Sequence, residues 1–174
     1  MCANLNIPSI QSRLKVVYSP AELPRQNWLQ IARVYWRMAR LMGATLRQRN
    51  VTLAQFEILA ILDAGEGISQ QELAEHMLVT KGNVCTVLTR MEEAGLIRRK
   101  PDLRDGRAKN LFLTNTGRSL FAQLGPLVDR SIQDVFGNLS ATNQQGLQES
   151  LDQLERGLME KGYTTAGLNP ETEI

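Results

Sequence analysis

The sequence is poor in the residues from which catalytic and metal sites are most often built. Its 174 residues include one histidine, His76, and two cysteines, Cys2 and Cys85. A single histidine removes most histidine-based catalytic and zinc arrangements, and two thiols without clustered histidines do not make a metal site. A disulfide between Cys2 in the N-terminal arm and Cys85 in a predicted helix is not expected. Because no nucleophile–base pair or phosphate-binding loop appears either, we expect no enzyme and no cofactor.

Long apolar runs and a secretory leader are also missing. No stretch approaches the roughly 20 apolar residues that a membrane-spanning helix needs. The N-terminus has no cationic head followed by an apolar core, which is the pattern of a secretory signal. We therefore expect a cytoplasmic protein. Its 43% hydrophobic and 22% charged residues are ordinary for a globular domain with a sizeable core.

Charge is nearly balanced overall, at +2, but it is unevenly distributed along the chain. Residues 1–50 carry eight basic residues and one acidic residue, whereas residues 51–79 carry five acidic residues and no Lys or Arg. Residues 80–110 carry eight basic and four acidic residues, and residues 141–174 carry six acidic and two basic residues. Such segregation of charge is what recognition of a polyanion requires.

Apolar periodicity and capping residues predict a mostly helical chain with one small hairpin. Thr52-Leu-Ala-Gln55 and Ser69-Gln-Gln-Glu72 are capping-box patterns that begin two of the helices. The predicted order is an N-terminal arm (1–25), a long helix (26–47), a helix after Thr52, a short helix after Ser69, a helix over 81–94, a hairpin of strands 97–100 and 110–113, a helix over 114–137 that Pro126 should bend or split, and a last helix after Ser140.

The helix over 81–94 has the two-sided composition that a helix in a DNA major groove needs. Its inward arc is apolar and comprises Val84, Val87, Leu88 and Met91. Its outward arc is small and polar, so a duplex can approach closely and Asn, Arg and Thr can read base edges. The helix starts at Ser69 and Thr80 also present N–H groups to phosphates. We predict DNA contacts from Ser69, Gln70, Thr80, Lys81, Gly82, Asn83, Thr86, Thr89 and Arg90.

The hairpin concentrates positive charge. Arg104 and Arg107 lie in its turn, and arginine is the side chain best suited to a narrow minor groove. Asp102 and Asp105 are expected to brace these arginines by bidentate pairing. Further cations lie on or near the strands, within reach of phosphates: Arg98, Arg99, Lys100 and Lys109. The alternative interpretation is a solvated basic loop.

These stretches resemble the MarR-type winged helix-turn-helix regulators. The resemblance rests on Gln71-Glu-Leu-Ala74, Met91-Glu-Glu-Ala-Gly-Leu-Ile97, Asp102-Leu-Arg-Asp-Gly-Arg107 and Leu113-Thr-Asn-Thr-Gly-Arg118. It covers roughly residues 50–122 and implies a mostly α fold with a small β-hairpin wing. It also implies an obligate homodimer with interlocked terminal helices, with Arg107 at the wing tip and Asp105 as its brace.

Two features depart from the pattern of this family. Thr86 stands where many members carry Arg or another long polar side chain, which leaves the base preference open. The N-terminal arm is longer than usual, which suggests extra dimer contacts. With the resemblance, the expected division of the chain is an arm (1–25), a dimerisation helix (26–50), a winged helix-turn-helix domain (51–122), C-terminal dimerisation helices (123–165) and a tail (166–174).

The flanking helices leave alternatives open. A stripe of leucines spaced four, three and four residues apart suits a helix–helix seam, which packs either within or between subunits, and the resemblance favours the latter: Leu147, Leu151, Leu154 and Leu158. The arginine face of the first helix is either solvated, paired with acidic segments of a partner subunit, or part of an anion pocket near Trp36, Arg37 and Arg40. Because many such regulators bind small aromatic anions, the resemblance favours an effector at these three residues.

The function expected from the sequence is that of a transcriptional regulator that acts as a repressor. Two copies bind double-stranded DNA at a pseudo-palindromic operator, and a small aromatic or anionic effector releases them. One alternative is a winged-helix module that binds proteins and no DNA. Another is a redox-responsive regulator in which the Cys85 thiol is the sensor, because Lys81 one turn earlier could stabilise a thiolate.

Overall fold

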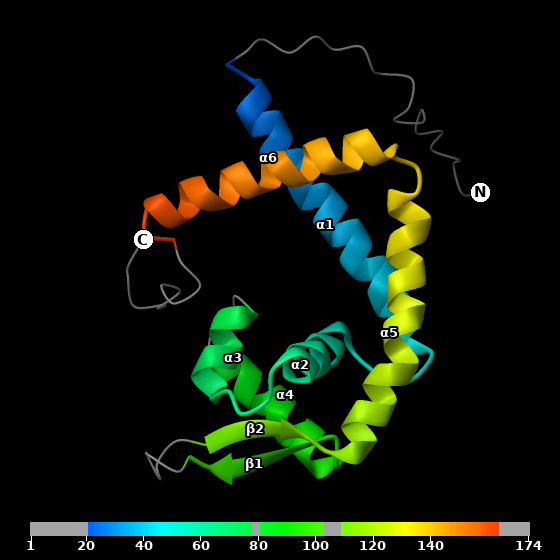
Figure 1. Cartoon of the computed structure of the whole chain (residues 1–174), viewed down its shortest axis with the longest axis vertical. Helices are drawn as coiled ribbons and strands as arrows, with labels where there is room; N and C mark the ends of the chain where they lie inside the picture. Colours follow the sequence, from blue (N-terminus) through cyan, green and yellow to red (C-terminus); the bar gives the residue numbers. More distant parts are fainter. Residues whose placement is uncertain (1–20, 78–80, 103–108, 164–174) are drawn as a thin grey trace, which may run out of the picture. The chain divides into compact units, whose positions relative to one another are not determined.

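The structure, a computed structural model, describes residues 21–77, 81–102 and 109–163. Within these residues it contains six helices and one two-stranded hairpin (Figure 1). Their bounds are α1 Leu23–Arg47, α2 Leu53–Ala64, α3 Gln70–His76, α4 Lys81–Glu93, β1 Ile97–Pro101, β2 Lys109–Leu113, α5 Asn115–Phe136 and α6 Ala141–Glu160. The chain divides into two compact units, residues 1–38 and 39–174, with the boundary inside α1.

In the first unit, α1 begins at Leu23, before the predicted start at residue 26. Pro24 lies in its first turn, where the N–H that proline lacks would have no helical partner. Three aromatic side chains of this unit are exposed: Trp28, Tyr35 and Trp36. Tyr35 and Trp36 meet edge to face, with ring centroids 5.5 Å apart.

The predicted caps of the described helix starts are present. Both capping boxes form: the Thr52 hydroxyl accepts from the N–H of Gln55, and the Ser69 hydroxyl accepts from the N–H of Glu72 at 3.1 Å. The Glu72 carboxylate in turn accepts the Ser69 N–H at 2.6 Å. At the start of α6 the Ser140 hydroxyl accepts the Asn143 N–H at 3.2 Å. Thr80, the predicted cap of α4, lies outside the described residues.

The core of the second unit gathers around α2 and α4. The side chains of Val84, Leu88 and Met91 on α4 are buried, as predicted, and Val87 packs partly buried beside them. They meet residues of α2, α3 and the hairpin, among them Ile58, Leu59, Leu62, Leu73, Ile97, Leu111 and Leu113. A second cluster joins the end of α1 to α5 through Leu46, Val51, Leu124 and Val128.

The hairpin has both predicted strands, each one residue longer than expected. Ile97 lies opposite Leu113, and Pro101 lies opposite Lys109. The chain before α3 adds to the free edge of β2, which the sequence did not predict. The Gly67 N–H donates to the carbonyl of Leu111 at 2.8 Å, and the Leu111 N–H donates to the carbonyl of Ile68 at 2.9 Å.

The junction between the hairpin and α5 is tightly packed. Gly95, two residues after the end of α4, has a φ of 70°, which is the left-handed conformation that was predicted. The Thr114 hydroxyl accepts the Gly117 N–H at 3.0 Å and donates to the carbonyl of Gly95 at 2.6 Å. A side chain at Gly117 would place its Cβ 2.1 Å from the carbonyl oxygen of Leu96. Glycine is therefore required at position 117.

α5 runs unbroken through Pro126, so the proline does not split the helix. Figure 1 shows α5 leaving the hairpin and changing direction along its length, as a proline in a helix interior favours. None of the helices in the described part of the chain has the length and apolarity that a membrane crossing requires. In the same residues, no group of three or more His, Cys, Asp or Glu is placed to hold a metal ion.

Candidate nucleic-acid interface

α4 separates an apolar face from a polar one, as its sequence predicted. Opposite the buried Val84 and Leu88, the residues Gly82, Thr86 and Arg90 are exposed. From Lys81 to Met91 the helix carries no acidic residue. The helix backbone includes the predicted contact positions Lys81 and Asn83, whose side chains lie outside the described part of the structure. This exposed arc is uncharged or basic, small near its start, and open to a large ligand.

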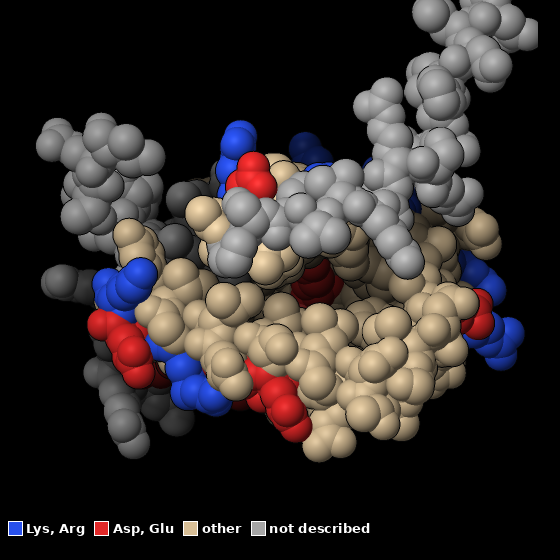
Figure 2. Space-filling model, turned by 90° about the horizontal axis from the view of Figure 1, so that it is seen from above, with Lys and Arg blue, Asp and Glu red and all other residues tan. Residues whose placement is uncertain are grey.

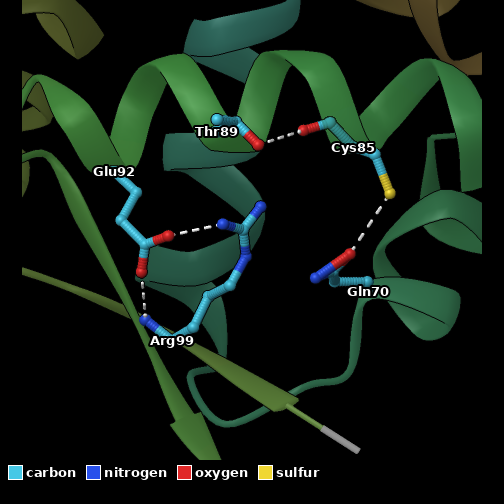
Figure 3. Close-up of polar contacts among 5 residues, drawn as sticks. All are labelled: Gln70, Cys85, Thr89, Glu92 and Arg99. Atoms are coloured by element: carbon cyan, nitrogen blue, oxygen red, sulfur yellow. Dashed lines mark hydrogen bonds and ion pairs between the residues drawn. The ribbon is translucent and has the colours of Figure 1, made fainter.

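One hydrogen bond connects the start of α3 to α4, and a second lies within α4 (Figure 3). The Cys85 thiol, which is half-buried, donates to Oε1 of Gln70 at 3.4 Å. The Thr89 hydroxyl donates to the carbonyl oxygen of Cys85 at 3.0 Å. Of the predicted contact residues, Gln70 and Thr89 therefore already hold protein partners. Ser69 is also occupied, because its hydroxyl caps α3.

Arg99, one of the cations predicted to contact phosphates, forms an ion pair within the protein. The Arg99 guanidinium forms an ion pair with the Glu92 carboxylate at the end of α4, and the Arg99 N–H donates to the other carboxylate oxygen at 3.1 Å (Figure 3). The Arg99 side chain is only 14% exposed. We expected Arg99 to lie within reach of phosphates, but its nearest anionic partner is Glu92 of the same chain.

The predicted wing tip, with Arg104, Asp105 and Arg107, lies outside the described residues. At its margins, Asp102 accepts a hydrogen bond from the side-chain amide of Asn110 at 2.8 Å, and Lys109 is exposed. The hydrogen bond between Asn110 and Asp102 connects the residue before the wing tip to β2. It does not test the predicted pairing of Asp102 and Asp105 with arginines.

The outer face of the hairpin carries two cations over one aromatic ring. The Lys100 ammonium lies 4.9 Å, and the Arg98 guanidinium 6.0 Å, from the centroid of the Phe112 ring. Both distances are within the range of cation–π attraction. Both cations are exposed, so they stay available to an anion while the ring restrains their stems.

Glu66 fastens the other end of the hairpin. Its Oε1 accepts the Leu113 N–H at 2.7 Å and an Arg118 guanidinium N–H at 2.6 Å. Burial disfavours the charged carboxylate, but the hydrogen bonds from Arg118 and Leu113 outweigh it, so the pKa of Glu66 lies below its ordinary value. Glu66 therefore joins the loop after α2 to β2 and to the first turn of α5.

The residues predicted for dimerisation and for an effector are exposed. The α6 leucines 147, 151, 154 and 158 are 40%, 43%, 55% and 52% exposed. Beside them, a groove between α5 and α6 is lined by Ile132, Phe136 and Gln144, among others. Trp36, Arg37 and Arg40 are exposed as well.

Sequence reasoning missed Glu92, Glu66 and Arg118 as organising residues of this site. Arg118 stands in the motif Leu113-Thr-Asn-Thr-Gly-Arg118, which was noted only as a resemblance. Glu66 lies 52 residues from Arg118 in the chain, and no periodicity connects them. A hint for Glu92 was available, because an acidic residue in the predominantly basic segment 80–110 invites a search for a cationic partner.

Known proteins resemble this chain over the same region. The model of the MarR family matches residues 51–109. The HTH-type transcriptional repressor Rv2887 of Mycobacterium tuberculosis is 32% identical over 113 residues, which are 65% of this chain and 81% of that protein. A crystal structure of Rv2887, with p-aminosalicylic acid, matches with a TM-score of 0.60 at 28% identity, covering 73% of this chain and 96% of that one.

Two structures solved with DNA have a closer overall fold. A mutant of MarR from E. coli, complexed with operator DNA, matches with a TM-score of 0.71 at 25% identity, covering 79% of this chain and 99% of that one. The transcriptional repressor CouR, bound to a 23-mer DNA duplex, matches with a TM-score of 0.70 at 27% identity, covering 79% and 98%. The helix-turn-helix, the hairpin and these likenesses together show that the chain belongs to the MarR family, whose members are transcriptional regulators and not enzymes.

Proposed function

We propose that this regulator is a repressor that binds double-stranded DNA sequence-specifically as a homodimer. Two copies of α4 enter successive major grooves of a pseudo-palindromic operator, with half-sites about one helical turn apart. The observation that carries this proposal is the two-sided α4, which buries Val84 and Leu88 and exposes Gly82, Thr86 and Arg90. The complexes of MarR and CouR with DNA support it.

Different parts of the site have different roles in this proposal. Asn83, Thr86 and Arg90 read base edges, because their side-chain types pair with adenine, thymine and guanine. Arg104 and Arg107 enter the minor groove, with Asp105 as a brace. The remaining predicted residues lie against the phosphates and set the register, with Ser69, Gln70 and Thr89 contributing through the atoms that their protein partners leave free: Ser69, Gln70, Thr80, Lys81, Gly82, Thr89 and Lys109.

The dimer is proposed to form through residues 26–50 and 123–165, on either side of the winged domain at 51–122. Large apolar side chains of α6 are left in solvent, among them Leu147, Leu151, Leu154 and Leu158, and a second copy would cover them. Figure 2 shows that most of the described surface in this view is uncharged, and that basic and acidic side chains lie next to one another in small groups.

An effector completes the proposal. A small aromatic anion bound near Trp36, Arg37 and Arg40 would change the separation of the two DNA-binding domains and so release the operator. The complex of Rv2887 with p-aminosalicylic acid supports this chemical class. Calorimetric titration with p-aminosalicylic acid, on wild type and on Arg40→Gln, tests both the class and the residue.

The test of DNA binding is selection of a duplex from a randomised pool, followed by fluorescence anisotropy at several salt concentrations. We expect affinity to fall steeply with salt, because phosphate contacts release counterions. Arg107→Ala should weaken binding to every sequence, and Asn83→Ala should change the preference at particular base pairs. Equal losses on all sequences for Asn83→Ala would contradict base readout by that residue. A protein that selects no duplex would instead be the protein-interaction module.

An experiment also distinguishes the effector-released repressor from a redox-responsive regulator in which Cys85 is the sensor. The Cys85 thiol lies at the α3–α4 contact, so its oxidation would disturb that contact with Gln70. Hydrogen peroxide should then abolish duplex binding by wild type and spare Cys85→Ser. If both proteins respond alike, Cys85 is not a sensor.

A further inference from the structure

We propose that Glu92 is a positioning residue, which holds the hairpin against the end of α4 so that the helix and the wing meet one duplex together. The inference rests on the proposed DNA binding. It assigns to a carboxylate, a group that DNA repels, a part in the affinity for DNA.

The contact joins two elements through both oxygens of one carboxylate. One oxygen accepts the backbone N–H of Arg99 at 3.1 Å, and the other pairs with the Arg99 guanidinium (Figure 3). A single acceptor would leave β1 free to swing about it, whereas two acceptors on one planar group fix both position and direction. The Arg99 N–H is thereby bound to a side chain on α4 and not to β2.

Burial makes this contact stiffer than an ordinary surface ion pair. The side chain of Arg99 is 14% exposed and that of Glu92 is 39% exposed. Nε of Arg99 is buried and has no hydrogen-bond partner within the described structure. The guanidinium therefore depends on Glu92 to offset its loss of water, and it has little freedom to leave.

The position of the pair in the fold gives it its effect. Glu92 is in the last turn of α4, and Arg99 is in the middle of β1. The segment proposed to reach the minor groove follows β1 in the sequence. The orientation of β1 relative to α4 therefore sets where that segment starts relative to the helix in the major groove.

Charge alone predicts the opposite effect of removing Glu92. A carboxylate near a DNA-binding surface repels phosphates, so its neutralisation should strengthen binding. The neighbouring Glu93 provides the matched control, because its side chain is exposed and has no hydrogen bond or ion pair in the part of the chain that the structure describes. Glu93→Gln changes the net charge by the same amount without touching the contact.

The experiment compares wild type, Glu92→Gln and Glu93→Gln on a duplex that wild type selects. We expect Glu93→Gln to bind as well as wild type or better, and Glu92→Gln to bind at least about 5-fold more weakly, since the lost wing contacts outweigh the charge gain. Thermal unfolding followed by circular dichroism verifies that each variant is folded. Binding by Glu92→Gln that is as strong as that of Glu93→Gln would overturn the proposal.

A double-mutant cycle separates positioning from a general structural defect. In wild type, Arg107→Ala should weaken binding by about 10-fold, whereas in Glu92→Gln it should weaken binding by less than about 3-fold, because the wing is already displaced. An unchanged Arg107→Ala penalty would contradict the inference. If Glu92→Gln does not fold, Arg99→Lys, which keeps the charge but loses the planar pairing, replaces it in the same cycle. Absence of binding by wild type and Glu93→Gln alike would count against the proposed function itself.

Discussion

At the scale of single residues, folding shifts the pKa values of two carboxylates near α2 in opposite directions. Glu66 accepts hydrogen bonds from Leu113 and Arg118, and its pKa is lowered despite the burial that opposes this. Glu57, within α2, has a raised pKa because burial disfavours its charged form. Folding therefore favours ionised Glu66 and protonated Glu57, and the two should affect stability with opposite dependence on pH.

The first prediction concerns Glu66→Gln. Because the pKa of Glu66 is lowered in the folded protein, its contribution is present above the ordinary value of 4.5 and is lost as pH falls through the folded pKa. The variant should be less stable than wild type at neutral pH by about 1 kcal/mol, a modest figure because the Arg118 pair is partly solvated. The difference should vanish in acid. Urea unfolding between pH 3 and pH 7 measures it.

Glu57→Gln is the matched variant of opposite sign. Since the pKa of Glu57 is raised, its favourable contribution is present below 4.5 and is lost as pH rises through the folded pKa. The variant should equal wild type in acid and exceed its melting temperature at neutral pH. Parallel pH profiles for the two variants would contradict the assigned causes.

Gly117 supports the second prediction. Gly117→Ala places a Cβ 2.1 Å from the carbonyl oxygen of Leu96, a backbone atom that cannot move without shifting the hairpin. We expect a loss of roughly 3 kcal/mol or failure to fold. Gly146→Ala in α6, whose Cβ would meet no atom within 4 Å, should instead be neutral or gain up to about 1 kcal/mol. Chemical denaturation that shows equal stabilities for the two variants would contradict this packing argument.

At the scale of elements, α3 is a helix of seven residues whose start depends on its capping box. The third prediction is that Ser69→Ala lowers the free energy of unfolding by about 1 kcal/mol, because the Glu72 N–H loses its acceptor. Loss of this bond should also increase hydrogen exchange of the first amides of α3. Ser119→Ala, on the exposed side of α5, is the control and should change neither measurement.

Also at this scale, two polar contacts add to the buried core in holding α4 in place. The Cys85–Gln70 bond connects it to α3, and the Glu92–Arg99 pair connects it to β1. The two contacts lie on the flank of the helix, between its buried arc and its exposed arc (Figure 3). They orient the exposed arc without using any of its surface.

At the scale of the whole molecule, the exposed leucines of α6 lead to the fourth prediction. Leu154, which is 55% exposed, should be covered in the proposed homodimer, so Leu154→Glu should shift the protein toward monomer. Sedimentation velocity measures the change, and Gln153→Glu, an exposed neighbour given the same charge, should remain dimeric. A monomeric wild type, or a dimer unaffected by Leu154→Glu, would contradict this assignment.

Local chemistry determined what the sequence predicted correctly. The capping boxes at Thr52 and Ser69, the left-handed Gly95 and the buried arc of α4 depend on residues within one or two helical turns of each other. The two strands of the hairpin were likewise predicted from short apolar and β-prone runs on either side of a polar turn. The start of α1 was misplaced because Pro24 is compatible with both an extended arm and a first helical turn.

The sequence by itself determined the helix-turn-helix, its hairpin and the polar face of α4, because periodicity and caps are properties of neighbouring residues. Only the tertiary structure decided that Arg99 pairs with Glu92, that Glu66 joins β2 to Arg118, and that residues 67–69 extend the sheet. Polar partners of this kind leave no period in the sequence. The packing of the buried core brings them within hydrogen-bonding distance, and the low exposure of Arg99 makes its pairing with Glu92 necessary.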